Sequence, residues 1–283
     1  QDILKRISEA YRRIRNTFRF LIGNLYDFDP ARDGLAFADL EEHDQWILRE
    51  LNQLIAQLTQ AYDTYQFHRV YQMVHNFCTI HLSALYLDVV KDRLYCSGSN
   101  DATRRSAQTA CRHILDVLVR VVAPVLVFTA DEVWEAAGLG PERSVHLAEF
   151  PKERQEWRAP HLADKWNQLL ELRSEVSRVL EDRRRDKVIG HSLDARVTIT
   201  ARDAEQEAFL LKNVALLKNL FIVSGIQIAP PSAGAASTGW TIEVDRAEGD
   251  KCERCWMYDL QVGADTLHPG LCPRCADVVR RIG

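Results

Sequence analysis

The sequence predicts a mainly α-helical protein, with an antiparallel helix bundle over residues 1–150, a small α+β region over 151–245 and a four-cysteine module over 246–283. Three observations lead to this fold class. Apolar residues recur at steps of three and four through the first half of the chain, which is the period of amphipathic helices. Short segments in which apolar and polar residues alternate, as is typical of strands, come only later in the chain. Two Cys-x-x-Cys pairs then stand near the C-terminal end.

The first predicted helix covers about residues 3–25 and combines an apolar stripe with a basic row. At about 100° per residue, Lys5, Arg12, Asn16 and Arg19 share one face, with Arg15 at its edge. This row is suited to contact a phosphate backbone or base edges, and the alternative is a solvated charged face. The apolar stripe, which we expect to face the core, consists of Ile3, Ile7, Ala10, Tyr11, Ile14, Phe18, Leu21, Ile22 and Leu25.

The remaining helices of the bundle are predicted from helix-capping residues and from the spacing of apolar residues. Asp39 with Glu42 predicts a capping box for the second helix. The stretch 117–127 is almost wholly apolar, so its helix should lie at the centre of the bundle, where Pro124 kinks or ends it. Short connections predict an up-down arrangement. The helices after the first are expected at about 40–62, 65–92, 102–128 and 129–134.

The second region begins after a Gly- and Pro-containing link at 138–160. A helix over 161–187 ends in the basic cluster 183–187, which is either a solvated helix terminus or a contact to a nucleic-acid backbone. A Pro-, Ser- and Gly-rich flexible loop is expected at 229–239. Around it, the α+β unit is predicted from a strand at 196–200, a helix at 205–219 and strands at 221–228 and 240–244.

The four-cysteine module carries the strongest chemical signal. Cys252, Cys255, Cys272 and Cys275 form two Cys-x-x-Cys pairs, and each two-residue gap can place both sulfurs on one side of a tight turn. This spacing predicts one Zn²⁺ in a zinc-ribbon-like module, with no coordination site left for catalysis. So small a segment would draw much of its folding free energy from the metal. The alternative is two disulfides or four free thiols.

Composition excludes several other classes. The absence of a membrane-length apolar run and of a signal peptide predicts a cytosolic protein without membrane attachment. The net charge of −4 argues neither for nor against binding to nucleic acid. We find no nucleophilic triad, Gly-rich phosphate loop or acid–base carboxylate pair, so no catalytic residue is expected. The start at Gln1, already in a helical pattern, indicates a piece of a longer chain. These features together favour a binding module, and exposed Arg and Trp beside a zinc knuckle favour nucleic acid.

Several motifs also point to a known family. They are Ser8–Thr17 with Arg19–Leu21, Gly23–Leu25 and Asp27–Pro30; Phe67–Tyr71; Tyr86–Asp88; Ala123–Pro124 with Thr129–Trp134; Lys187–Ala195; and the terminal Cys-x-Arg-Cys-Trp and His-Pro-Gly-Leu-Cys-x-Arg-Cys segments. In this order they closely resemble the anticodon-binding helical domain and zinc domain of bacterial isoleucyl-tRNA synthetases. The helical motifs would also fit the valyl and leucyl relatives, and the zinc module singles out the isoleucyl family.

The resemblance implies binding to the anticodon stem-loop of isoleucine tRNA. It implies that the four cysteines are zinc ligands, that Arg254 and Trp256 contact the anticodon loop, and that Arg12, Arg15 and Arg19 contribute from the first helix. Trp256 could instead pack against the metal core. The His-Ile-Gly-His and Lys-Met-Ser-Lys-Ser type signatures are absent, so the adenylation and editing domains of such an ATP-dependent ligase would lie outside this chain. We expect a non-catalytic monomer.

Two other classes remain as alternatives. A zinc-finger DNA-repair glycosylase, or a related DNA-binding protein, also ends in a four-cysteine finger, but it needs an N-terminal proline nucleophile that this chain does not show. The third reading is a structural or protein-interaction module whose basic row is solvated. Salt-dependent preference for RNA hairpins over DNA duplexes would separate the three.

Overall fold

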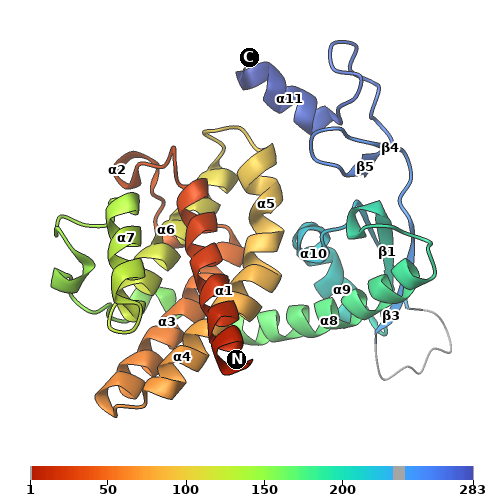
Figure 1. Ribbon diagram of the computed structural model, residues 1–283. Coiled ribbons are helices and arrows are strands. Elements are labelled where there is room, and N and C mark those ends of the chain that lie inside the picture. Colours follow the sequence, from red (N-terminus) through yellow and green to blue (C-terminus); the bar gives the residue numbers. More distant parts are fainter. Residues whose placement is uncertain (1, 232–239, 283) are drawn as a thin grey trace. The chain divides into compact units, whose positions relative to one another are not determined.

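The computed structural model describes residues 2–231 and 240–282, and the chain divides into two compact units, Gln1–Pro160 and His161–Gly283 (Figure 1). The first unit is helical, and the second combines helices with a small sheet and the four-cysteine module. The prediction of a mainly α protein with these parts is therefore confirmed. None of the helices in the described residues is both long and apolar enough to span a membrane.

Helix α6 (Ala102–Val122) is the centre of the first unit, as its apolar sequence predicts. It packs against α1 (Asp2–Asn24), α3 (Glu42–Asp63), α5 (Leu87–Cys96) and α7 (Val127–Ala137). Its side chains from Arg104 to Cys111 and most of those up to Val122 are buried. The unit also contains α2 (Pro30–Asp33), α4 (Phe67–Asn76), the π-helical segment η2 (Phe77–Tyr86) and the 3₁₀ turns η1 (Phe37–Asp39), η3 (Val145–Leu147) and η4 (Gln155–Trp157).

The start of α3 differs from the sequence prediction. Asp39 ends the η1 turn, and the N-cap of α3 is Glu41, whose side chain makes no capping hydrogen bond. The Glu41 backbone N–H donates instead to Ser106 Oγ of α6 at 2.8 Å. The predicted capping box of Asp39 with Glu42 is therefore wrong, because a tertiary contact satisfies this end of the helix in place of a local one.

The predicted helix over 65–92 is interrupted by the π-helical segment η2. There the Leu87 backbone N–H bonds to the Leu82 carbonyl, five residues back, and Ser83 Oγ donates to the Cys78 carbonyl at 2.8 Å. Such wider turns occur as short inserts within α-helices. A stripe with a 3.6-residue period cannot reveal them, which explains the difference.

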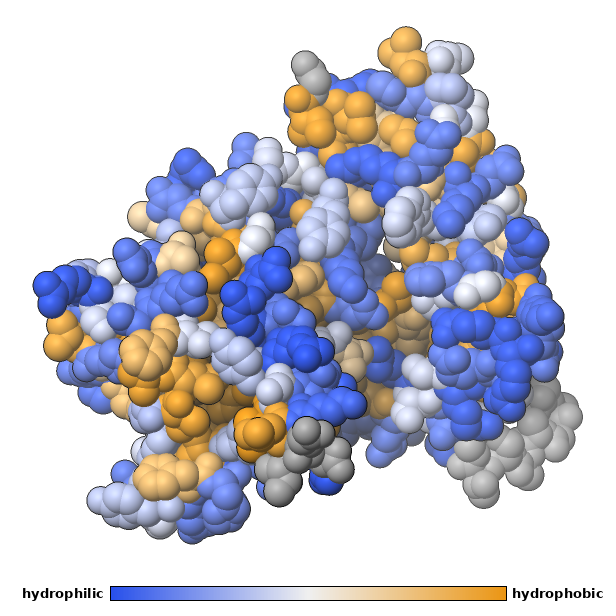
Figure 2. Space-filling model, in the orientation of Figure 1, coloured by the Kyte–Doolittle hydropathy of each residue, from blue (hydrophilic) through white to orange (hydrophobic). Residues whose placement is uncertain are grey.

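Two further helix ends can be compared with the sequence. α6 stops at Val122, so Pro124 ends this helix and does not merely kink it. On α1, the stripe residues Ala10, Ile14, Phe18 and Leu21 are buried, whereas Ile7 is 56% exposed and Tyr11 is 37% exposed. Figure 2 shows an apolar area on the face of the first unit that carries α1 and α7, which contact each other. Phe128 of α7 is also exposed. The N-terminal end of the predicted stripe is thus not core.

Residues 151–160 pack on the helices of the first unit. The Arg154 N–H donates to Asn52 Oδ1 at 2.8 Å, and the buried Trp157 ring contacts His113 edge-on at 5.1 Å between centroids. The compact first unit therefore includes these residues, whereas the sequence boundaries of 150 and 245 stay a prediction for the extent of separate domains.

The second unit is built on α8 and a three-stranded sheet of order β2-β1-β3. β1 runs parallel to β2 and antiparallel to β3, so Val197 lies between Ile226 and Val244. The predicted helix over 205–219 is split at Asn213, and the predicted loop 229–239 lies mainly at 232–239, outside the described residues. The elements are η5 (Pro160–Leu162), α8 (Ala163–Arg185), η6 (Ser192–Asp194), β1 (Ala195–Thr200), α9 (Ala204–Lys212), α10 (Val214–Phe221), β2 (Gly225–Ala229) and β3 (Thr241–Arg246).

The four-cysteine module follows β3 and contains the antiparallel strands β4 (Asp250–Lys251) and β5 (Tyr258–Asp259) and the helix α11 (Pro273–Ile282). Gly249, with φ +90°, is required before β4, because a Cβ there would lie 2.4 Å from the Asp259 carbonyl carbon. The Tyr258 N–H donates to Ser224 Oγ at 2.7 Å. This bond attaches the module to the residues just before β2.

Candidate metal centre and nucleic-acid interface

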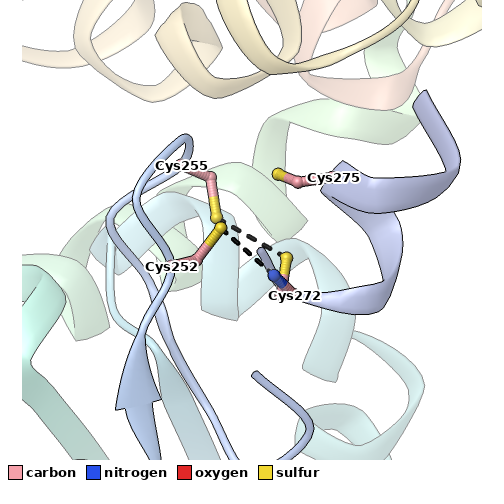
Figure 3. Close-up of side chains that lie close together, drawn as sticks. All are labelled: Cys252, Cys255, Cys272 and Cys275. Atoms are coloured by element: carbon pink, nitrogen blue, oxygen red, sulfur yellow. Dashed lines mark hydrogen bonds between the residues drawn. The ribbon is translucent and has the colours of Figure 1, made fainter. Parts of the chain in front are cut away.

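The four cysteines converge in one cluster (Figure 3). Cys252 and Cys255 lie in the turn between β4 and β5, while Cys272 precedes α11 and Cys275 stands in its first turn. All four side chains are buried, and their Sγ atoms lie within 4.8 Å of one another. The structure thus brings together all the metal ligands expected from the sequence.

Backbone hydrogen bonds set the turn that carries the first pair. The Trp256 N–H donates to the Cys252 carbonyl at 2.9 Å, and the Cys252 N–H donates to the Met257 carbonyl at 2.9 Å. The Cys272 N–H then donates to Cys252 Sγ at 3.3 Å, which joins the second pair to the first. The backbone therefore holds the sulfurs close without help from a large apolar core.

The geometry fits a tetrahedral thiolate site. Zinc–sulfur bonds of about 2.3 Å in a tetrahedron place the sulfurs roughly 3.8 Å apart. Cys255 Sγ and Cys272 Sγ are 3.8 Å apart. A disulfide needs about 2.05 Å between sulfurs, and all four cysteines are free. The disulfide alternative is therefore not supported, and the donor set is that of a metal-binding cluster whose four positions are all filled by protein.

Each Cys-x-x-Cys pair contains an arginine that hydrogen-bonds to a cysteine sulfur of the other pair. Arg254, within the first pair, donates from Nη1 to Cys275 Sγ of the second at 3.8 Å. A hydrogen bond with Cys275 lowers the pKa of Cys255 to about 5, and a hydrogen bond from Arg274 of the second pair adds to this lowering. Positive charge next to thiolates offsets their mutual repulsion. Sequence reasoning missed Arg274, and the signal was the repeated Cys-x-Arg-Cys pattern.

The indole of Trp256 lies at the surface of this module. It is 60% exposed, and Lys251 Nζ lies 5.7 Å from the ring centroid. The residue has φ +65°, a left-handed conformation that a bulky side chain rarely adopts. The ring is therefore accessible to a partner and does not fill the metal core.

The basic row of α1 belongs to the first unit. Arg12, Arg15, Asn16 and Arg19 are exposed on the helix, and Arg12 Nη1 lies 2.9 Å from Glu9 Oε2. Such an exposed pair is worth little and can open for a ligand. No ion pair of Arg15 or Arg19 occurs in the described part of the chain. The structure places the row in solvent, in a different unit from the cysteines.

Comparison with known proteins gives matches to both parts. Residues 44–199 match the family described as the anticodon-binding domain of tRNA ligase, and residues 249–278 match a zinc finger found in FPG and IleRS. Proteins named isoleucine–tRNA ligase align over almost the whole chain. Those of Desulfitobacterium hafniense (strain DSM 10664 / DCB-2), Syntrophotalea carbinolica and Geobacter sulfurreducens are 47%, 46% and 46% identical over 99%, 98% and 99% of this chain. The chain spans only 31%, 30% and 31% of the length of these relatives.

Proposed function

Because the chain belongs to the family of the anticodon-binding domain of tRNA ligases, we propose that it binds the anticodon stem-loop of isoleucine tRNA. The observation that carries this proposal is the order of the two matched ranges, in which a helical anticodon-binding domain precedes an exposed indole beside a four-cysteine finger. The longer protein would join isoleucine to its tRNA with ATP in the cytoplasm. This part would act as a monomeric, non-catalytic arm of it.

The alternatives are less well supported. The zinc finger is found in two kinds of protein, so that match alone does not separate an RNA-binding from a DNA-repair role. The anticodon-binding match covers α3 through most of β1 and favours RNA. An exposed indole also suits the unstacked bases of a loop better than the paired bases of a duplex.

The cluster of Cys252, Cys255, Cys272 and Cys275 would hold one Zn²⁺. The metal would supply folding free energy to the module, because the four thiolates leave no site open to water or substrate. Its effect on RNA binding would be indirect. It fixes the turn on which Trp256 stands, so that the indole meets the base in a defined orientation.

RNA recognition would divide between two kinds of contact. Trp256 would stack on an unpaired anticodon-loop base, and Arg254 would contact the loop beside it. From α1, Arg12, Arg15 and Arg19 would neutralise phosphates, and Asn16 would address a phosphate or a base edge. Phosphate contacts position the RNA, whereas base contacts select it.

Binding to RNA hairpins tests the function directly. We expect the chain to bind a hairpin with an isoleucine anticodon more tightly than one with a single anticodon base changed, and more tightly than a DNA duplex, at two salt concentrations. Equal affinity for duplex DNA would favour the DNA-repair alternative. Absence of salt-dependent binding to any of these would favour a protein-interaction module.

Trp256→Ala should weaken hairpin binding by about ten- to a hundred-fold, since stacking on an aromatic side chain contributes roughly 1 to 3 kcal/mol per base. Zinc content and the thermal unfolding midpoint should stay close to those of the parent chain, because the indole is mostly in solvent. A large loss of stability in place of a loss of binding would show that the ring belongs to the core of the module.

Arg254 and Arg274 allow a matched comparison, since each is the third residue of a Cys-x-Arg-Cys pair. Either change to alanine removes a donor to a cluster sulfur and should lower zinc affinity by roughly 10- to 100-fold. With zinc in excess, Arg254→Ala should still weaken hairpin binding, whereas Arg274→Ala should not. Equal hairpin affinities of the two variants under these conditions would limit Arg254 to supporting the metal site.

A further inference from the structure

A second basic site lies at the end of α8. Arg184 and Lys187 from that end, and Arg246 from the end of β3, line a pocket of about 340 Å³ with the segment 188–190 and Asp194. Basic residues at the C-terminal end of a single helix are explained by their attraction to the negative end of the helix dipole. Here a third guanidinium comes from a different element, so the dipole does not account for the whole arrangement.

The charges in the pocket leave a positive excess. Arg184 is paired with Glu181, one turn earlier. Asp194 Oδ2 accepts hydrogen bonds from the backbone N–H groups of Gly190 at 3.0 Å and His191 at 2.8 Å, so local donors bind this carboxylate. Within the described residues, neither Lys187 nor Arg246 forms an ion pair. Two cations are therefore available to an anion from outside.

The backbone at Lys187 is unusual for a lysine. Its φ is +61°, and the Lys187 and Val188 N–H groups bond to the carbonyls of Arg184 and Arg183 at 3.1 and 3.0 Å. This is the Schellman ending of a helix, and its left-handed position favours glycine because any Cβ is strained there. A glycine would therefore fit this backbone at least as well as the lysine, so the charge of Lys187 can be removed without disturbing the end of α8.

The pocket adjoins the zinc module through one contact. The Arg246 guanidinium lies 6.0 Å from the centroid of the Tyr258 ring, and Tyr258 is two residues beyond the exposed Trp256. Tyr258 is held by its backbone bond to Ser224. The basic pocket and the indole are therefore parts of the same compact unit, joined by an aromatic–guanidinium contact.

We infer that Lys187 and Arg246 bind a backbone phosphate of the RNA whose loop base stacks on Trp256. This inference rests on the proposed function and adds to it a site in the α+β region. Of the two interpretations of the basic cluster 183–187, a solvated helix terminus or a contact to a nucleic-acid backbone, it selects the second. A phosphate contact carries no sequence preference, so the site would strengthen binding to every anticodon equally.

The test is the salt dependence of hairpin binding by the full chain, using hairpins with the isoleucine anticodon and with one changed base. Lys187→Gly removes the charge while suiting the left-handed backbone, so the variant should unfold at the same temperature as the parent chain or higher. We expect Lys187→Gly and Arg246→Gln each to weaken both hairpins several-fold. Each should also reduce the slope of log affinity against log salt by about 0.7 to 1.

Two control variants sharpen this result. Lys212→Gln, at an exposed lysine ending α9, should change neither the affinity nor the slope. Trp256→Ala should weaken binding but keep the parent slope, because stacking releases no counterions.

The outcomes separate the inference from the function. A parent chain that binds hairpins, with Lys187→Gly unchanged in affinity and slope, would overturn the inference alone. A parent chain that binds no hairpin would overturn the function and this site with it. Stabilisation of the parent chain by inorganic phosphate, lost in Lys187→Gly without any effect on hairpin binding, would show an anion site that RNA does not use and would also overturn the inference.

Discussion

Cys255→Ser is expected to release the metal and unfold the four-cysteine module, while the helical unit 1–160 keeps its own unfolding transition. In residues 250–282 as described, the buried apolar side chains besides the four cysteines are only Ala276 and Val278. So small a core cannot offset the conformational entropy of ordering the module. Structural zinc contributes on the order of 10 to 16 kcal/mol in comparable peptides, and this is folding free energy.

The measurement combines zinc content with circular dichroism and limited proteolysis. Cleavage of the variant should appear near the module and not in α3 to α6. Cys96→Ser, which changes a buried cysteine of the first unit, should keep its zinc and is the matched control. Cys255→Ser with a full equivalent of zinc would contradict the assignment of this ligand, and collapse of the helical unit would contradict its independence.

Loss of the metal should also remove discrimination between anticodons. The turn between β4 and β5 places Trp256, and its backbone hydrogen bonds include one to the carbonyl of Cys252, a member of the four-cysteine cluster. Adding a chelator to the parent chain should therefore reduce the difference in affinity between matched and changed hairpins. Residual binding through the phosphate contacts should remain, with its salt dependence intact.

The metal cluster was predictable from sequence because its geometry is local. A two-residue gap between cysteines fixes a turn, and the two pairs need only meet. The helices of the first unit were predictable for a similar reason, since burial on one face repeats every 3.6 residues. The apolar stretch before Pro124 even identified the central helix.

What sequence could not give depends on tertiary contacts. The prediction of the N-terminal cap of α3 was wrong because the Glu41 N–H donates a hydrogen bond to Ser106, which is far away in the sequence. The crosswise position of Arg274 depends on how the two cysteine pairs face each other. Lys187 reads as one charge in a basic run, and its left-handed backbone and its position beside Arg246 become visible only in the fold.

The acidic stretch 27–50 illustrates the same limit. By sequence it is a stretch rich in acidic residues after a basic helix. The fold pairs Asp27, Asp33 and Asp44 of this stretch with arginines of later helices. Asp27 accepts two hydrogen bonds from the buried Arg104 of α6, at 2.7 and 3.0 Å. The arginines that neutralise this stretch are thus structural, and composition alone cannot separate them from arginines that are exposed to solvent, such as Arg12, Arg15 and Arg19.

Asp44 on α3 is the most buried of these acids and joins helices that are far apart in sequence. It is fully buried and accepts hydrogen bonds from Nη1 and Nη2 of Arg93 on α5, at 2.8 and 2.7 Å. Tyr86 Oη of η2 donates to it at 2.8 Å, and Ser106 Oγ of α6 also donates. Burial by itself would raise the pKa of Asp44, but the attraction and hydrogen bonds of Arg93 outweigh burial and hold the pKa below its ordinary value.

Asp44→Asn should therefore destabilise the first unit by about 3 to 5 kcal/mol, because it leaves the Arg93 charge buried without a counterion. Chemical denaturation of the helical unit measures this. The matched control is Asp88→Asn, which breaks the exposed pair of Asp88 with Lys91 and should cost no more than about 1 kcal/mol. Similar small losses in both variants would mean that water reaches Arg93 and that the network does not hold the helices together.

The pH dependence provides an independent check on Asp44. Its pKa is lower in the folded state than the ordinary value of 3.8, so the unfolded chain binds the proton more readily. The stability that Asp44 contributes is then fully present above that ordinary value and is lost as the pH falls towards the folded-state pKa. The difference in unfolding free energy between the parent chain and Asp44→Asn should stay constant at neutral pH and narrow only below about pH 3.8. A difference that widens as the pH falls from 7 to 5 would require a folded-state pKa that is raised, and would show that desolvation dominates over Arg93 at this site.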